Sequence, residues 1–219
     1  MSSSLVTTLC AAEKFNKSHL STPKVAALLE EAKFFYIGGF FLTHGIESAL
    51  EVAKKASEQG KVVALNLSAP FIPQFFKAQL DTILPYADIV IGNESEAESW
   101  GEAAGVADKK DLASIARSIA LFAKSNPSRP RLVVLTHGAE STIVVSAATA
   151  NEPKVYPVKK LSEAEIVDTN GAGDAFAGAF LGAYVLGKSV DEAVEVGHRL
   201  GAICVGQVRT FLCYPYAYR

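Results

Sequence analysis

The sequence has few cysteines, and their positions exclude two common kinds of scaffold. Its 219 residues contain three cysteines, Cys10, Cys204 and Cys213. An odd number at these wide spacings fits neither a disulfide framework nor a zinc site. Free cysteine is among the residue types most often buried in globular proteins. The sequence therefore predicts buried free thiols.

The sequence also lacks an excess of charge of one sign. It has 21 Lys and Arg residues against 23 Asp and Glu residues, a net charge of −2, and no run of basic residues longer than two. A protein that binds nucleic acid normally presents a basic field to the phosphate backbone. We therefore expect no nucleic-acid partner.

Long apolar runs are missing as well. No apolar stretch approaches the roughly 18 residues that a membrane-spanning helix needs. The first residues, MSSSLVTTLCAAEKF, contain neither a basic leader nor a long apolar region. These absences predict a protein without membrane contact, located in the cytoplasm, with the nucleus left open.

The sequence contains enough apolar residues to form a hydrophobic core. Hydrophobic residues make up 49% of the chain and charged residues 20%, a balance typical of a globular protein rather than of a disordered chain. Length and composition together favour a single domain over residues 1–219.

Short apolar segments alternate with helical patterns along the chain. Segments rich in β-branched or aromatic residues predict buried strands, and capped patterns between them predict helices. The predicted strands cover residues 34–37, 61–67, 88–91 and 132–136, and the predicted helices cover residues 23–32, 47–59, 94–104 and 111–124. Residues 142–145 and 154–158 alternate like an antiparallel pair. Together these patterns predict an α/β fold, a mostly parallel sheet flanked by helices on both faces, with the antiparallel pair at one edge.

Polar and aromatic residues follow each of the four parallel strands. The first two strands are followed by GGFF at 38–41 and NLSAPF at 66–71, and the other two by GNESE at 92–96 and THG at 136–138. Open parallel sheets bind ligands beyond the carboxyl ends of their strands. Any one of these segments could be ordinary loop chemistry, but four at one edge favour a ligand site.

The strongest signal is DTNGAGDAF at residues 168–176, which opens a helix that continues to about residue 186. Glycines allow close backbone approach, and the free amides and dipole of a helix N-terminus favour a phosphate. Phe176 stands where a dinucleotide-binding loop has its third glycine, and the Gly-Lys-Ser/Thr of a Walker loop is missing. Alternatively, Asp174 merely complements the helix dipole. The helix is apolar almost all round, so we expect it to be buried.

Residues 168–176 resemble the second signature of the ribokinase-like, or PfkB, family of sugar and nucleoside kinases, in the form found in its adenosine kinases. The resemblance extends to YIGGFFLT at 36–43, LNLSAPF at 65–71 and GNESEA at 92–97, and it covers about residues 4–208. It implies the ribokinase-like fold, with three α/β/α layers, and an ATP-dependent phosphotransferase with an alcohol acceptor. The implied reaction transfers the γ-phosphate of ATP to the 5′-hydroxyl of adenosine and gives AMP and ADP, a step of purine salvage.

By that resemblance, Asp174 takes the position of the catalytic base that accepts the proton of the 5′-hydroxyl. The amides of Gly171, Ala172 and Gly173 would form an anion hole for charge that grows in the transition state. Phosphoryl transfer depends mainly on such positioning and charge stabilisation.

The resemblance also assigns Asn93 and Glu96 to an Asn-x-x-Glu motif that organises magnesium-bound waters around the ATP phosphates. Mg²⁺ prefers oxygen ligands, held partly through water. The alternative is that Glu94, Glu96 and Glu98 are simply acids in the first turns of a helix, where acids are favourable. Asp168 would border a monovalent-cation site.

Aromatic and small residues at the other strand ends match the two substrate sides of the family. Phe40 or Phe41 matches the aromatic that stacks on the adenine of adenosine, and Phe71 matches another wall of that pocket. An aromatic after a strand can equally be core, whereas offset stacking on a purine would be the functional gain. Thr136 and Gly138 match the strand end that lines the ATP side.

The resemblance is incomplete at both ends of the chain. The family's first strands, its Gly-Gly-Asn nucleoside motif and its lid have no counterpart here, and residues 209–216 fit poorly the segment that completes the ATP base pocket. We therefore expect little activity from the chain by itself, and an exposed apolar sheet edge through which it could form an oligomer. Two alternatives stay open: a catalytically silent part of this fold that binds nucleotide or a partner, and a ribokinase-type sugar kinase.

Overall fold

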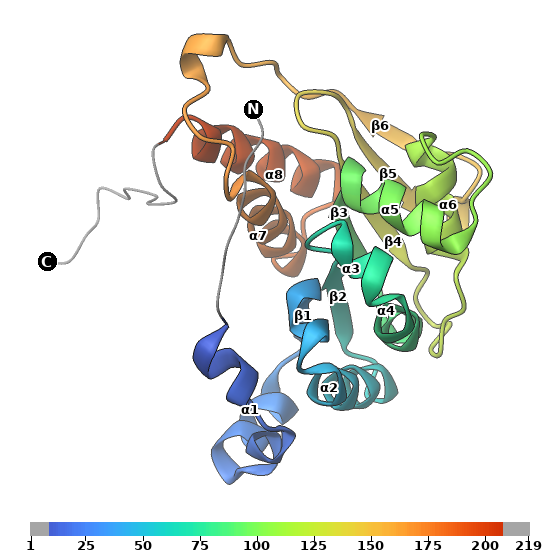
Figure 1. The fold of residues 1–219 in the computed structure, drawn as a ribbon, viewed down its shortest axis with the longest axis vertical. Helices are drawn as coiled ribbons and strands as arrows, with labels where there is room; N and C mark the ends of the chain where they lie inside the picture. The colour runs from blue at the N-terminus through green and yellow to red at the C-terminus, as the bar shows by residue number, and fades with distance from the viewer. Residues whose placement is uncertain (1–8, 208–219) are drawn as a thin grey trace, which may run out of the picture.

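The computed structural model describes residues 9–207, and its centre is a six-stranded sheet whose strands follow one another in chain order (Figure 1). Strands β1 to β4 run parallel, and β5 and β6 continue the sheet antiparallel. The strands are β1 (Phe34–Gly38), β2 (Val62–Asn66), β3 (Ile89–Asn93), β4 (Leu132–Thr136), β5 (Thr142–Ser146) and β6 (Lys154–Tyr156). The predicted α/β class, with an antiparallel pair at one edge, is confirmed.

Helices cover both faces of this sheet (Figure 1). On one face, α7 and α8 pack against residues such as Ala64, Ile91 and Val134. On the other face, α2 to α6 form a larger core with residues such as Leu65 and Val90. The helices are α1 (Pro23–Glu31), α2 (Ile46–Glu58), α3 (Phe71–Phe75), α4 (Lys77–Ile83), α5 (Glu94–Ala104), α6 (Leu112–Leu121), α7 (Ala172–Val185) and α8 (Val190–Val205).

The sequence explains where these elements lie. Since helices cover both faces of the sheet, β2 is buried at all five positions and β3 at four of five, as their apolar runs predict. Capping boxes begin α5 at Asn93 and α8 at Ser189, and Gly105 ends α5 in the left-handed conformation. Local signals therefore fix the helix ends next to the sheet.

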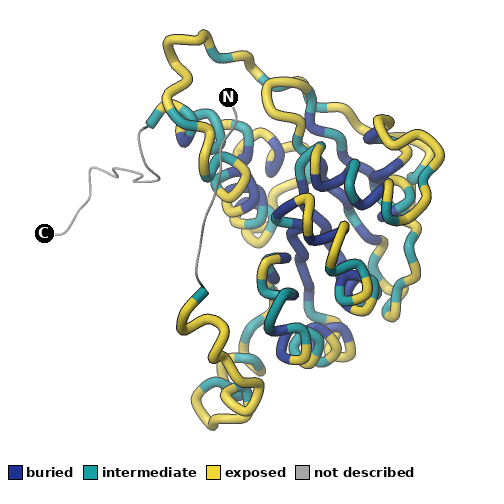
Figure 2. The backbone as a smooth tube through the Cα atoms, viewed as in Figure 1, coloured by how far each residue is buried: buried dark blue, intermediate teal, exposed yellow. Residues whose placement is uncertain are grey.

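The expectation that α7 is buried almost all round is wrong. The helix buries Phe176 and Phe180, but Gly178, Gly182 and Val185 on other sides are exposed. Figure 2 shows buried and exposed stretches of chain in the same region of the molecule. Within residues 9–207, the sheet and α8 are the elements that pack against it. The glycines of α7 therefore face solvent here, whereas Ala177, Ala179 and Ala183 are buried.

The expectation of buried thiols is correct at one of the two described cysteines. Cys204 in α8 is buried, whereas Cys10 lies exposed in a short 3₁₀ helix, Cys10–Lys14. Cys213 lies outside the described residues. The short segment around Cys10 buries no residue, which explains the difference.

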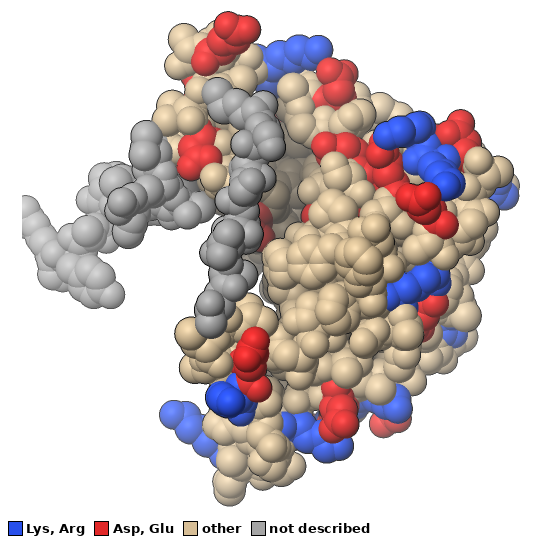
Figure 3. All heavy atoms as spheres, viewed as in Figure 1, with Lys and Arg blue, Asp and Glu red and all other residues tan. Residues whose placement is uncertain are grey.

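The surface carries charged side chains of both signs. On the face shown in Figure 3, Lys and Arg side chains lie among Asp and Glu side chains. Across residues 9–207, no helix is both long enough and apolar enough to cross a membrane. Location in the cytoplasm and the lack of a nucleic-acid partner stay predictions.

A buried arginine joins several elements at the amino ends of the parallel strands. Arg131, directly before β4, has no solvent exposure. Its guanidinium donates hydrogen bonds of 2.6–3.5 Å to the carbonyl oxygens of Leu84, Ala87, Ile119, Ala120, Phe122 and Ala123. The last carbonyls of a helix have no partner within the helix. Arg131 therefore supplies donors to the end of α6 and to the segment before β3.

Candidate active site

The carboxyl ends of the four parallel strands meet at one edge of the sheet. In the strand register, Gly38 lies opposite Asn66, and Asn93 lies opposite Thr136. Asn66 also lies opposite Ile91, so the four strand ends form a continuous row. The structure therefore brings together the four segments that the sequence predicts to border a ligand.

Asn93 and Glu96 form a capping box at the junction of β3 and α5. The Asn93 side chain accepts a hydrogen bond from the Glu96 amide at 2.9 Å. The Glu96 carboxylate accepts from the Asn93 amide at 3.0 Å and from its side-chain nitrogen at 2.9 Å. Burial raises the pKa of Glu96 to about 7; the bond from the Asn93 backbone opposes this rise, and the charges of Glu94 and Asp174 add to it. A buried acid near a second carboxylate is typical of a functional site.

The glycine-rich loop leads into α7 as the sequence predicts. Gly171 has a φ of +79°, in the left-handed region that glycine adopts at little cost. The Ala172 amide donates to the Thr169 carbonyl oxygen at 3.3 Å. Asp174, the third residue of the helix, is exposed. This end of α7 presents first-turn amides, the positive end of the helix dipole and a carboxylate together.

The C-terminal end of α8 holds the loop that precedes α7. The Val205 carbonyl oxygen accepts from the amides of Val167 and Asp168 at 2.9 and 3.1 Å. The Cys204 thiol donates to the Asn170 carbonyl oxygen at 3.6 Å. The position of the glycine-rich loop therefore depends on α8 as well as on its own sequence.

Asp174 lies close enough to the side chains of Glu96, Tyr36 and Cys204 to affect their ionisation. Its charge contributes to the raised pKa of Glu96. Burial raises the pKa of Tyr36, a bond from Asn66 opposes the rise, and the charges of Asp174 and Glu96 add to it. Residues from α7, α5 and β1 thus share one electrostatic environment.

The two aromatic positions that follow β1 have different surroundings. Phe40, in the short 3₁₀ helix Gly39–Thr43, pairs with Phe71 at the start of α3, with ring centroids 5.8 Å apart. These two side chains are 45% and 37% exposed. Phe41 instead packs edge-on against Phe15 and His44, with centroids 5.7 and 5.2 Å away. Of the two alternatives, Phe40 is the one that lies with Phe71.

Thr136 and Gly138 lie at the end of β4, next to Asn93 in the strand row. The Thr136 hydroxyl donates to the Gly92 carbonyl oxygen at 3.4 Å. Gly138 has a φ of +50° and is exposed, and apart from its own chain neighbours no atom lies within 4 Å of the position that a Cβ would take. The backbone here is open to a ligand.

The side chains at the end of β3 suit a magnesium ion held largely through water and phosphate oxygens. Among residues 9–207, no three His, Cys, Asp or Glu side chains are grouped so as to hold a metal ion by themselves. Glu96 and Asn93 provide oxygen atoms, and a nearby cation favours the ionised form of Glu96. Mg²⁺ typically keeps several waters and takes one or two carboxylates plus substrate phosphates. The residues present therefore fit this ion.

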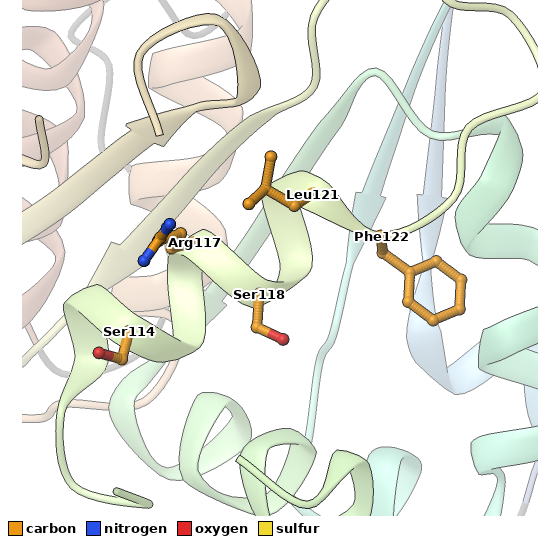
Figure 4. Close-up of a pocket in the computed structure, with 5 residues that line it drawn as sticks. All are labelled: Ser114, Arg117, Ser118, Leu121 and Phe122. Carbon is orange, nitrogen blue, oxygen red and sulfur yellow. The ribbon is translucent and has the colours of Figure 1, made fainter. Parts of the chain in front are cut away.

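A pocket on α6 lies apart from this row of strand ends. Its volume is about 460 Å³. Figure 4 shows the lining side chains along α6 and just after it: Ser114, Arg117, Ser118, Leu121 and Phe122. They come from a single stretch of chain rather than from converging elements. None of them is a predicted site residue.

Asn66, Ser68 and Tyr36 lie in segments that the sequence singles out, 66–71 and 36–43, but the sequence gives none of the three a role. The side-chain nitrogen of Asn66 donates to the Tyr36 hydroxyl at 3.0 Å, and the side-chain oxygen accepts from the Ser68 amide at 2.9 Å. Alternation along β1 places Tyr36 on the same face as Phe34, which packs against Tyr184 of α7. That alternation could have placed Tyr36 on the α7 side, but its contact with Asn66 depends on the pairing of β1 with β2.

A three-layer α/β sheet with a glycine-rich helix start and an Asn-x-x-Glu capping box at one edge defines a ribokinase-like protein, and the solved structures compared below have this fold. The chain belongs to the pfkB family of carbohydrate kinases, whose model matches residues 2–216. The family resemblance of its motifs is thereby confirmed.

Within the family, the chain is similar to adenosine kinases. It is 55% identical over 212 residues to the adenosine kinase of Schizophyllum commune and 45% identical over 212 residues to that of Schizosaccharomyces pombe. Each match covers 97% of this chain, and 62% and 61% of the two relatives. The structure of Anopheles gambiae adenosine kinase in complex with P1,P4-di(adenosine-5) tetraphosphate superposes with a TM-score of 0.86 at 40% identity, covering 89% of this chain and 57% of that chain. The chain thus spans about 60% of the length of these relatives.

Proposed function

We propose that this chain carries the catalytic and phosphate-binding part of an adenosine kinase, which transfers the γ-phosphate of ATP to the 5′-hydroxyl of adenosine and releases AMP and ADP. The observation that carries the proposal is the convergence of Asp174, at the N-terminus of α7, with Asn93 and Glu96 at the end of β3. A proton acceptor and groups that stabilise phosphate charge are what phosphoryl transfer requires.

Asp174 is the proposed base. Its carboxylate is exposed, so an alcohol can approach it. As the hydroxyl oxygen attacks the γ-phosphorus, its proton passes to Asp174, and the bond between the phosphorus and the bridging oxygen of ADP breaks. The amides of Gly171, Ala172 and Gly173 are the proposed donors to the phosphoryl oxygens.

Glu96 and Asn93 are the proposed residues for magnesium, which neutralises phosphate charge when bound. Both Glu96 oxygens already accept hydrogen bonds from Asn93, so contact through water is the arrangement that we favour. Asp168 is the proposed border of a monovalent-cation site. Its carboxylate accepts a bond from the Asn170 amide at 2.9 Å.

Phe40 and Phe71 are the proposed walls for the adenine of the nucleoside, because two exposed rings can stack on a purine. Thr136 and Gly138 are the proposed residues on the ATP side, where the backbone is open. The Anopheles gambiae relative supports both sides, since its bound molecule contains two adenosines joined by four phosphates.

The exposure of the site favours a second candidate function, in which this chain binds nucleotide but turns it over slowly. Within residues 9–207, Asp174, Phe40 and Phe71 are all open to solvent. Transfer needs the 5′-hydroxyl in line with the γ-phosphate, and a misplacement of about 1 Å can cost 10²-fold in rate. We therefore expect the 219-residue chain by itself to be a slow enzyme.

The test is AMP formation from adenosine and MgATP by two proteins. One is the 219-residue chain, and the other, the fused protein, joins it to the segments of the Schizophyllum commune relative that lie outside the matched 212 residues. We expect AMP from the fused protein, and a rate at least about 100-fold lower from the chain alone. Ribose is the control acceptor. Phosphorylation of ribose but not of adenosine would favour a sugar kinase, and phosphorylation of neither by the fused protein would contradict the proposed function.

A further inference from the structure

Ser68 has an unusual backbone conformation directly after β2. Its φ is +67°, and among the non-glycine residues in the described range 9–207 only Cys10 shares a positive value. This conformation is unfavourable for a residue with a Cβ, and it persists where the surroundings enforce it, often at functional sites. We therefore expect contacts around Ser68 that hold its backbone in this conformation.

Hydrogen bonds around Asn66 enforce this conformation. The Asn66 side chain accepts from the Ser68 amide at 2.9 Å and donates to the Tyr36 hydroxyl at 3.0 Å. The Ser68 hydroxyl accepts from the Gly39 amide at 2.8 Å and donates to the Asn66 carbonyl oxygen at 3.3 Å. We call Tyr36, Gly39, Asn66 and Ser68 the Asn66 clamp. It joins β1 and the segment after it to the segment after β2.

The two segments are in direct backbone contact at Gly39. A Cβ there would lie 2.6 Å from the Leu67 carbonyl oxygen and 2.7 Å from that of Asn66, which no side chain could tolerate without movement. At Gly38, in contrast, the nearest atom to a Cβ would be the Ser68 hydroxyl oxygen at 3.9 Å. The close approach is therefore specific to the residue that donates to Ser68.

The clamp lies between two parts of the candidate site, the aromatic pair Phe40 and Phe71 and the acidic residues Asp174 and Glu96. Phe40 directly follows the clamp in one segment, and Phe71 begins the helix that follows it in the other. Their ring centroids are 5.8 Å apart. At its other end the clamp includes Tyr36, whose pKa is raised by burial and further by the charges of Asp174 and Glu96. A shift of either segment would change the separation of the two rings.

We propose that Asn66 is a positioning residue for the nucleoside: through the clamp it holds Phe40 and Phe71 at a fixed separation, so that the slot for the base exists before the nucleoside binds. This proposal rests on the proposed function, because it takes adenine as the occupant of the slot. A preformed slot removes the cost of ordering two segments on binding. Affinity for the nucleoside should then depend on Asn66, whereas affinity for MgATP should not.

Asn126 provides a matched control at the opposite end of the strands. Its side-chain oxygen accepts from the Ser128 amide at 3.0 Å, and its side-chain nitrogen donates to the Ser57 carbonyl oxygen at 2.9 Å. Asn66 likewise accepts from the amide of a serine two residues later, but its side-chain nitrogen donates to the Tyr36 hydroxyl instead of a backbone carbonyl oxygen. Asn126→Ala therefore removes a similar link at the amino ends of the strands, away from the site.

The test measures dissociation constants for adenosine and, separately, for MgATP by NMR titration of the 219-residue chain and its variants. We expect Asn66→Ala to weaken adenosine binding about tenfold or more, the effect of losing one well-placed interaction, with MgATP affinity within about twofold of wild type. Ser68→Ala removes the acceptor of the Gly39 amide and the donor to the Asn66 carbonyl oxygen; it should act in the same direction and accelerate hydrogen exchange at the Gly39 amide. Asn126→Ala should change neither constant by more than about twofold.

The other possible results would each contradict either the positioning role of Asn66 or the proposed function. Equal adenosine affinity in wild type, Asn66→Ala and Ser68→Ala would overturn the positioning role and leave the proposed function in place. An equal loss of affinity for adenosine and MgATP would make Asn66 a general structural residue, which also overturns it. A wild-type chain that binds MgATP but not adenosine would contradict the preformed slot, and the positioning role with it, and leave the proposed phosphate-binding part in place. A wild-type chain that binds neither ligand would contradict the proposed function.

Discussion

Among single residues, Asp174 has the most specific proposed role. Asp174→Asn keeps the shape of the side chain but removes the proton acceptor. We expect AMP formation by the fused protein to fall about 10²- to 10⁴-fold, the usual contribution of a positioned base. The dissociation constant for MgATP should stay nearly unchanged, because the backbone amides of α7 remain. Steady-state kinetics and ATP titration measure the two quantities.

Asp191 provides the control for Asp174. It also lies in the first turn of a long helix, α8, where it is exposed and binds Lys154. If Asp174 only complemented the helix dipole, Asp174→Asn and Asp191→Asn would reduce turnover equally little. If Asp174→Asn retained most of the wild-type turnover, this result would contradict the role of Asp174 as the base.

The raised pKa of Glu96, about 7, should make nucleotide binding depend on pH. A cation beside Glu96 needs the ionised carboxylate, and the ionised fraction rises from about one-tenth at pH 6 to about nine-tenths at pH 8. We expect MgATP affinity to rise up to about tenfold over this range, and Glu96→Gln, which keeps the capping box, to remove this part of the rise. Calorimetric titration at both pH values measures it. An identical pH dependence in the variant would contradict the role of Glu96.

The same shift has the opposite effect on the stability of the chain without ligand. The folded-state pKa of Glu96 lies above the ordinary value of 4.5, so the folded state binds more protons than the unfolded state between these two values. The contribution of Glu96 to stability is therefore complete below about pH 4.5 and is lost as the pH rises through 7. In urea unfolding, wild type should lose stability relative to Glu96→Gln over this range.

At the scale of secondary-structure elements, most of the fold follows from local patterns. The predicted segments 132–136 and 94–104 coincide with β4 and α5, and the ends of the other predicted segments lie within three residues of the observed ones. The reason is that both elements carry strong local signals, a buried apolar run in β4 and a capping box in α5. The glycine-rich loop and α7 could be located for the same reason.

Other elements and contacts have no such signal. The helices α3 and α4 are short, five and seven residues, and are not among the predicted helices, since so short a segment shows no clear helical period. The predicted helices do not include α8 either, although the capping box at Ser189 is a local signal. The contacts of Asn66 and Arg131 join segments far apart in the chain, and fully buried arginines are rare. These features depend on tertiary packing, so the sequence patterns could not show them.

Arg131 joins the end of α6 to the segment before β3, so we expect its replacement to destabilise the fold. Arg131→Met would leave several buried carbonyl oxygens without a donor. We expect the free energy of unfolding to fall by several kcal/mol, because each buried acceptor that is left without a donor costs about 1–3 kcal/mol. Urea denaturation of both proteins measures the difference.

Arg117 is the control for Arg131, since it lies on the exposed face of the same helix, α6. Arg117→Met should change the free energy of unfolding by less than about 0.5 kcal/mol. Similar values for the two variants would show that Arg131 is not the structural junction that its hydrogen bonds indicate.

At the scale of the whole molecule, the two edges of the parallel strands have different roles. The carboxyl ends carry the candidate site, and the amino ends carry the junction at Arg131. In the part of the chain that the structure describes, β1 is at the end of the sheet, with Phe34 37% and Tyr36 50% exposed. Such an edge favours association with another strand. Association through it stays a prediction for the isolated chain.

We propose that β3, β4 and α7 of this chain together form a phosphate-binding site, and MgATP binding to the 219-residue chain tests this proposal. Ligand that binds only the folded state raises its stability, by about 1.4 kcal/mol at ten times the dissociation constant. For a chain of this size, the Tm should then rise by about 3–6 °C in millimolar MgATP relative to MgCl₂ alone. An unchanged Tm under these conditions would contradict the proposal.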